Sequence, residues 1–166
     1  MNRFVVVLAL VGGAMWPSAC ATRAADETHE RPPPPPAPAV VWASSVAAAH
    51  AFAAAQIQRG ELSEARSALV HVLELRAPSA VAPDDVAWVR QDLFARLAGL
   101  ELRAGEPQRA LDLANQGLAL GVSDTVPVLA LWSARGRAER ALGRSAESDV
   151  SFANTKRIRM ALGSKE

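Results

Sequence analysis

Residues that could act as nucleophiles, acid–base catalysts or metal ligands are few and scattered in this sequence. Its 166 residues include three histidines, His29, His50 and His71, and one cysteine, Cys20. A metal site needs several ligands, and a general base needs an oriented partner within hydrogen-bond reach. His50 and His71 have no adjacent cysteine or carboxylate cluster, and His29 lies in a polar, proline-rich stretch. We therefore predict a protein that is not an enzyme and that uses no metal or cofactor.

The adjacent carboxylates Asp84 and Asp85 are the remaining pair that could support catalysis. A catalytic carboxylate pair needs surroundings that push the two pKa values apart, and the neighbouring sequence supplies none. Acidic residues at this spacing are instead typical of the first turn of a helix, where they meet the positive end of the helix dipole. Glycine-rich phosphate loops, nucleophile elbows and zinc-binding spacings are missing from the sequence.

Composition predicts a helical protein with no strong charge. The net charge is +1, half of the residues are hydrophobic and only 5% are aromatic. Alanine is frequent, and alanine has the highest helix propensity. One cysteine excludes a disulfide scaffold, and the balanced charge argues against nucleic acid as a partner.

The first twenty residues have the layout of a secretory signal. Arg3 gives a positive start, residues 4–16 form an apolar run, and small residues follow up to Cys20. A helix over that run would reach about 20 Å, which is short of the ~30 Å hydrocarbon core of a membrane. We therefore expect residues 1–20 to direct export, with an uncleaved anchor as the poorer alternative.

Cys20 decides how this signal is processed. Ser18-Ala19-Cys20 resembles the end of a bacterial lipobox, although Pro17 stands where that motif commonly has leucine. The resemblance implies lipidation of Cys20, and Ala21 after it implies sorting to the outer membrane, facing the periplasm. Ordinary cleavage after Ala21 is the alternative, and it would give a soluble periplasmic protein.

Residues 21–39 are expected to be an extended tether. The stretch from Pro32 to Pro36 consists of proline alone, and each proline fixes φ and removes a backbone donor. Such a run favours a polyproline helix rather than an α-helix or an inner strand, and it would act as a spacer. A proline-rich ligand for an aromatic groove is the sharper alternative.

The remaining sequence repeats one pattern three times. Gly60, Gly105 and Gly143 each follow an Ala/Leu-rich stretch and precede a new helix start with acidic residues. The pattern predicts six helices, at residues 40–59, 62–76, 84–104, 107–120, 125–142 and 145–162. We expect Asp84 or Ser123 to cap a helix, and the extra residues 79–90 to lengthen a loop or the next helix.

Small residues recur where the two helices of each unit should cross. They lie at Ala53 and Ala65, at Ala98 and Ala110, and at Gly136 and Ser148. With Phe94 and Trp132 at the aromatic position and Pro78 at a unit end, this layout resembles the tetratricopeptide repeat. Gln56 and Glu101 depart from that family's usual tyrosine. The resemblance implies an all-α domain at residues 40–163, with three antiparallel helix-turn-helix pairs in a short right-handed αα-superhelix.

The resemblance also implies a non-enzymatic adaptor that binds a partner protein or peptide on a concave face, formed by the first helix of each pair. By position, the residues implied to line that face are His50, Ala54, Ile57, Gln58, Asp92, Ala95, Gly99, Arg103, Ser133, Arg137 and Arg140. Members that clamp a C-terminal carboxylate place lysine and asparagine where this chain has His50 and Ala54, so that type of clamp is not expected.

Charge distribution suggests an alternative function. Residues 128–166 contain eight basic and four acidic residues, so this end could bind an anionic envelope polymer or another anionic surface. Phe152 and Ile158 suggest an amphipathic last helix that closes the stack. A leftover apolar edge there could instead dock a partner or a second copy in a weak homo-oligomer.

Overall fold

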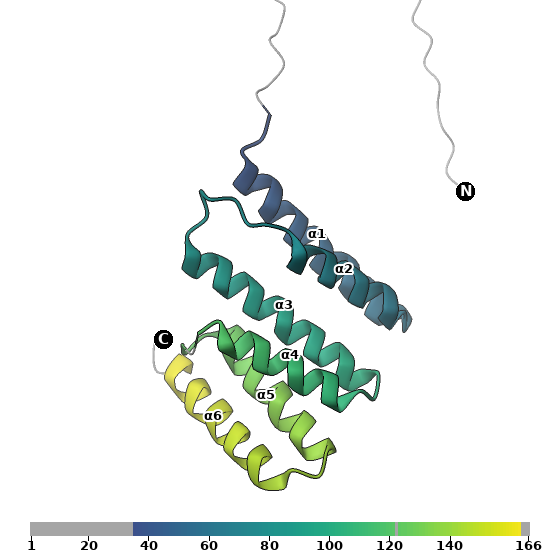
Figure 1. Cartoon of the computed structure of the whole chain (residues 1–166), viewed down its shortest axis with the longest axis vertical. Coiled ribbons are helices and arrows are strands. Elements are labelled where there is room, and N and C mark those ends of the chain that lie inside the picture. The colour runs from purple at the N-terminus through teal and green to yellow at the C-terminus, as the bar shows by residue number, and fades with distance from the viewer. Residues whose placement is uncertain (1–34, 122, 164–166) are drawn as a thin grey trace, which may run out of the picture. The chain divides into compact units, whose positions relative to one another are not determined.

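The computed structural model describes residues 35–121 and 123–163, and this part of the chain is helical, with no strand (Figure 1). It contains α1 (Pro38–Arg59), α2 (Leu62–Glu74), α3 (Pro83–Arg103), α4 (Pro107–Ala119), α5 (Val126–Ala141) and α6 (Ser145–Gly163). The predicted all-α class is thus confirmed. The predicted signal, Cys20 and all but the last few residues of the predicted tether lie outside the described residues.

All six predicted helices are present, and every boundary lies within two residues of its prediction. α1 begins at Pro38, inside the predicted tether, because proline is well tolerated in the first turn of a helix. The predicted caps were wrong. α3 follows Ala82 without a side-chain cap, and Thr125 caps α5 by accepting a hydrogen bond from the Val128 amide at 3.4 Å.

Three turns have the same backbone geometry. Gly60, Gly105 and Gly143 have φ of 79°, 78° and 76°, which is the left-handed region that favours glycine. In each turn the amide after the glycine donates to a carbonyl in the last turn of the preceding helix, at 2.8–2.9 Å. These bonds run from Glu61 to Gln56, from Glu106 to Glu101 and from Arg144 to Glu139.

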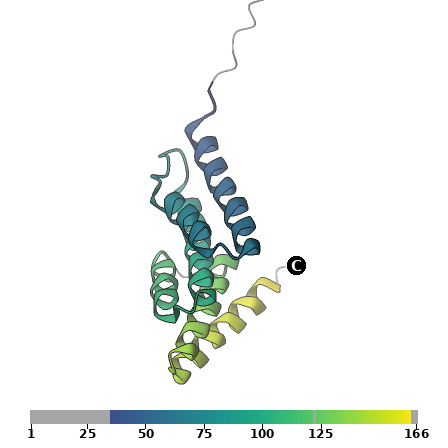
Figure 2. The same cartoon turned by 90° about the vertical axis from the view of Figure 1, so that its right-hand side faces the viewer.

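Consecutive helices pack as neighbours: α1 with α2, α3 with α4, and α5 with α6. The six small residues expected at the crossings are all buried. At the third crossing the Ser148 hydroxyl donates to the Gly136 carbonyl at 2.9 Å, and this bond satisfies a hydroxyl in the core. Figure 2 shows α2 and α4 along one side of the domain and α1 on the other.

The α3–α4 pair packs closely against the following pair, α5–α6. We call this contact the second joint. α5 lies against both α3 and α4. Gly117 of α4 makes this possible, because a Cβ there would lie 2.6 Å from a methyl carbon of Leu131 and 2.9 Å from Cβ of Phe94. Leu131 and Val128 are fully buried in the resulting apolar cluster.

The first joint connects the α1–α2 pair to α3 and is more open. α2 meets α3 over a short stretch, and within the described residues no Cα of α1 lies within 8 Å of a Cα of α3. Leu93, Leu97 and Leu100 of α3 bury their side chains in a cluster shared with α1 and α2. A bidentate ion pair also spans the joint, from Arg66 Nε and Nη2 to the Glu101 carboxylate, at 2.6 and 2.8 Å.

α1 is long and apolar enough to cross a membrane, judged by length and composition only. Its sequence from Pro38 to Gln58 contains no Asp, Glu, Lys or Arg. Val46, Ala49 and Ala53 are buried in the core shared with α2 and α3, and 22% of the most apolar stretch of this helix is buried.

Candidate functional site

The wide spacing of α1 and α3 leaves a groove between them that reaches the start of α5. We call it the α1–α3 groove, and its volume is about 430 Å³. Its apolar lining includes Trp42, Val46, Trp88, Val89, Val126 and Pro127. Trp88 is 48% exposed and Val126 66% exposed, so large apolar side chains face solvent there. Concave apolar surfaces with a few polar groups are the usual form of a binding site.

Repeat positions explain how this lining arises. Ala43, Trp88 and Val126 stand at the same distance in sequence before the glycine of their own turn, so they occupy equivalent positions on the first helix of each pair. All three line the groove. The groove therefore lies on the helices for which the tetratricopeptide resemblance implied a binding face.

Three polar side chains lie together in the groove. His50 of α1 approaches Asp92 of α3, with 3.4 Å between Nε2 and Oδ2, and Arg96 Nε donates to the same oxygen at 2.7 Å. Burial lowers the pKa of the His50 imidazole, the Arg96 guanidinium lowers it further, and the Asp92 carboxylate opposes both effects. His50 is therefore held mainly in its neutral form at pH 7.

Two buried nitrogen atoms of the groove have no hydrogen-bond partner within the described residues. They are Nε1 of Trp42 and Nε2 of His50, and Nε1 of Trp132 in α5 is a third such atom. Buried polar groups are satisfied in most native structures, so an unsatisfied group calls for an explanation.

The predicted lining residues differ in their surroundings. Their positions bring His50 and Asp92 together, whereas Gln58, Arg103 and Arg137 are exposed and Ser133 is half-buried. Ile57 packs against the core cluster of the first joint. Arg140 turns to α6, where its guanidinium lies 4.8 Å from the Phe152 ring centre and 3.8 Å from Asp149.

Sequence reasoning missed Trp42, Trp88, Val126 and Arg96. Trp42, Trp88 and Val126 lie near the starts of their helices. The predicted lining residues all lie nearer the ends of these helices, toward the glycine turns. Extending the same count back along each helix would have found Trp88 and Val126. Arg96 could not be found this way, because its role depends on how far α1 stands from α3.

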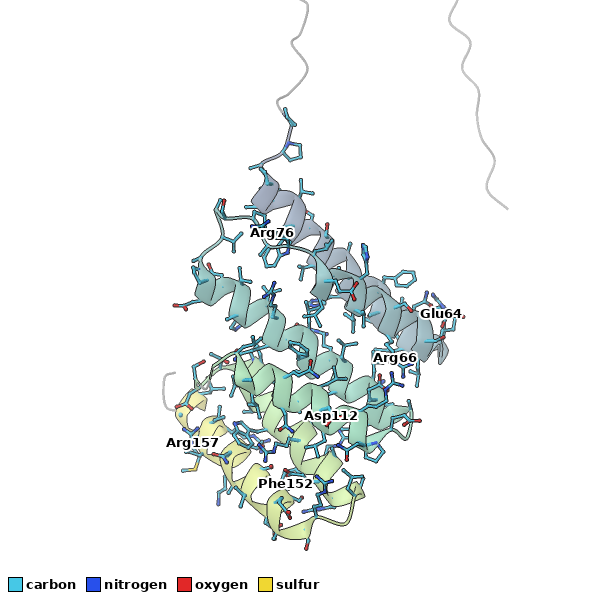
Figure 3. All side chains as sticks on the ribbon, viewed as in Figure 1. Glu64, Arg66, Arg76, Asp112, Phe152 and Arg157 are labelled. Carbon is cyan, nitrogen blue, oxygen red and sulfur yellow. The ribbon has the colours of Figure 1, made fainter. Side chains whose placement is uncertain are left out.

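A second hollow, of about 260 Å³, lies among α2, α3 and α4. Arg66 and Asp112 line it, and Figure 3 shows both on the face of the molecule formed by α2 and α4. Arg66 already neutralises Glu101, which is only 1% exposed, so this ion pair has a structural role. Over residues 35–121 and 123–163, no group of three potential metal ligands comes together.

Comparison of the chain with protein-family models, with curated protein sequences and with solved structures gave no match. The interpretation of the α1–α3 groove therefore depends on its own geometry.

Proposed function

We propose that this protein is a non-enzymatic adaptor of the bacterial cell envelope, built from three tetratricopeptide-like helix pairs in a short right-handed superhelix. Three turns with matching glycine geometry and buried small residues at each helix crossing support the repeat interpretation. In such arrays the first helices of the pairs form the surface that holds a partner's peptide or helix.

The observation that carries the proposal is the exposure of Trp88 and Val126 in the α1–α3 groove. Tryptophan is among the residue types that dominate binding energy in protein interfaces. Exposed Arg103 and Arg137, further along α3 and α5, can add ion pairs with an acidic partner segment.

Co-purification from the native host tests this function. Tagged full-length chain is isolated after mild cross-linking, together with two variants, Trp88→Ala in the groove and Val150→Ala as an exposed apolar control on α6. We expect a specific partner protein with the wild-type chain and the control, and a roughly tenfold or greater loss with Trp88→Ala. Equal recovery with all three chains, or no specific protein at all, would reject the groove as the binding site.

The proposal includes export and a lipid anchor at Cys20, which would hold the domain at the outer membrane on its periplasmic side. A soluble periplasmic form is the alternative. Mass spectrometry of the N-terminus of the protein from its host separates the two, because lipidated Cys20 and a chain beginning after Ala21 differ by the mass of the acyl groups and residues.

An anionic polymer or surface remains the second candidate partner, because part of the basic C-terminal region is unpaired. Arg137, Lys156 and Arg159 make no ion pair with another described residue, whereas Arg135, Arg140 and Arg157 are paired with carboxylates. Replacing Arg137, Arg140 and Arg144 together by glutamine should then weaken a salt-sensitive association. Unchanged binding by a folded triple variant would exclude this candidate.

A further inference from the structure

Beside the α1–α3 groove, at the start of α3, lies a further hollow of about 470 Å³. The first turns of α3 and the segment that connects α4 to α5 line it. Trp88 lines both this hollow and the α1–α3 groove, so the two adjoin at its side chain. Asp84 and Asp85 are exposed in its lining, and none of the other described residues that line it carries a charge. We call it the acidic hollow.

The two carboxylates of the acidic hollow are available to a partner. Neither Asp84 nor Asp85 forms an ion pair with another described residue. They stand four and three residues before Trp88, so they lie on the same side of α3, about one turn away. A lysine or arginine side chain could pair with these carboxylates and lie against the exposed Trp88 ring, because the face of an indole ring attracts a cation. The acidic hollow therefore fits a cationic group.

The opposite end of the same side of α3 is basic. Arg103 stands fifteen residues after Trp88, which is close to four helical turns, so it lies on the same side about 22 Å further along the axis. α5 runs in the same direction as α3 (Figure 1), and its Arg137 is the equivalent of Gly99 when each is counted back from the glycine of its turn. Arg103 and Arg137 are exposed, and neither forms an ion pair with another described residue. This end therefore fits a carboxylate.

The stretch between these two ends carries no net charge. Arg96 Nε donates to the Asp92 carboxylate at 2.7 Å, so these two charges offset each other. α1 forms the other wall of the groove, and it contains no Asp, Glu, Lys or Arg from Pro38 to Gln58. Along the axis of α3 the surface therefore changes from acidic, through an apolar centre, to basic.

We propose that this surface binds a partner protein segment with the complementary charge pattern. Its lysine or arginine enters the acidic hollow, a large apolar side chain lies beside Trp88 in the groove, and its aspartate or glutamate pairs with Arg103 and Arg137. The pattern sets the direction of the segment, because a reversed segment would place like charges together. The distance from Asp85 to Arg103 is about 27 Å along the helix axis, which about eight extended residues would span. This inference rests on the function proposed for the groove, and it adds the chemistry and the direction of the partner.

The test is photo-crosslinking of the full-length chain in its native host, followed by sequencing of the partner peptide in each adduct. Benzoylphenylalanine replaces Ala87, which lines the acidic hollow, or, in a separate strain, Gly99, where a Cβ has open space. We expect both positions to capture one segment of the same protein. The Ala87 adduct should fall at or beside a lysine or arginine, and the Gly99 adduct should fall toward an aspartate or glutamate.

Charge variants of the acidic hollow extend the test. Replacing Asp84 and Asp85 together by asparagine should lower the adduct yield at Gly99 by roughly three- to tenfold, whereas replacing both by glutamate should retain most of it. Glu147→Gln with Asp149→Asn removes two exposed carboxylates near the start of α6 and is the matched control, with an unchanged yield. Circular dichroism of the purified variants should show the same helix content as the wild-type chain.

Four results would overturn the inference: a captured segment without this charge pattern, the opposite direction, a yield that the asparagine variant leaves unchanged, or an equal loss in the glutamate variant. No adduct from either position would overturn it as well. In each of these cases the proposed function still stands if Trp88→Ala lowers the recovery of a specific partner. If no partner depends on Trp88, the proposed function is rejected together with this inference.

Discussion

The two joints between the helix pairs start from the same repeat and reach different contacts. At the second joint, Gly117 lets α4 and α5 meet so closely that Leu131 fills the space a side chain would need. The equivalent residue at the first joint is the buried Val72, which follows Gly60 at the spacing by which Gly117 follows Gly105. A valine there holds the helices further apart, so other side chains must connect them.

The difference leaves the α1–α3 groove at the first joint, and none of its kind is needed to explain the second. The first joint depends on a leucine cluster and on the Arg66–Glu101 ion pair. The backbones of α1 and α3 stay apart, and the α1–α3 groove occupies the space between them. The second joint buries its apolar residues against each other instead.

The largest expected effect comes from breaking the ion pair at the first joint. Arg66→Met leaves the Glu101 carboxylate buried without a partner, which should lower the free energy of unfolding by about 3–5 kcal/mol. Adding Glu101→Leu should recover most of this loss, because the unpaired charge is then removed. Urea unfolding followed by circular dichroism measures both variants.

Arg135→Met is the matched comparison in the last pair. Arg135 Nε donates to Glu139 at 2.8 Å, but the Ser151 hydroxyl also donates to this carboxylate, at 2.6 Å. The remaining hydrogen bond should make this loss smaller than the loss for Arg66→Met. An equal or larger loss would show that the Arg66 pair is not specially important to the first joint.

A smaller effect is expected from Gly117→Ala at the second joint. The new methyl group would overlap Leu131 and the Cβ of Phe94, and overpacking of this kind costs about 1–3 kcal/mol. Gly99→Ala is the control, because a Cβ at Gly99 meets nothing within 4 Å. That change should stabilise α3 by up to about 1 kcal/mol through helix propensity. If the two variants have the same free energy of unfolding, the close contact at Gly117 does not contribute to the stability of the second joint.

The smallest effect concerns His50 and depends on pH. Its pKa is lowered in the folded state, so the unfolded chain binds the proton more readily as the pH falls below 6.5. The stability of the first joint should therefore fall from pH 7.5 toward pH 5, and His50→Gln should reduce this fall. Urea unfolding of both chains across this pH range measures the difference, and a fall that His50→Gln leaves unchanged would contradict this prediction.

Most of the fold could be predicted from local sequence patterns, because glycine turns, prolines and small residues at helix crossings act on residues nearby in the sequence. They placed all six helices, and the small residues expected at the helix crossings are buried. The difference between the joints depends on Val72 and Gly117, whose importance appears only when the helices are docked. The contact of His50 with Asp92 could likewise not be predicted from the sequence, because it joins two helices whose separation the sequence pattern does not define.

The central claim is that the first joint is the open one, held by side chains around a groove. Amide hydrogen exchange of the full-length chain tests it directly, because exchange reports the free energy of opening of each helix. We predict that α1 and α2 open together at a clearly lower free energy than α3, α4 and α5, and that Arg66→Met lowers it further. Equal protection of α1, α2 and α5, with one opening free energy for the whole domain, would contradict the account.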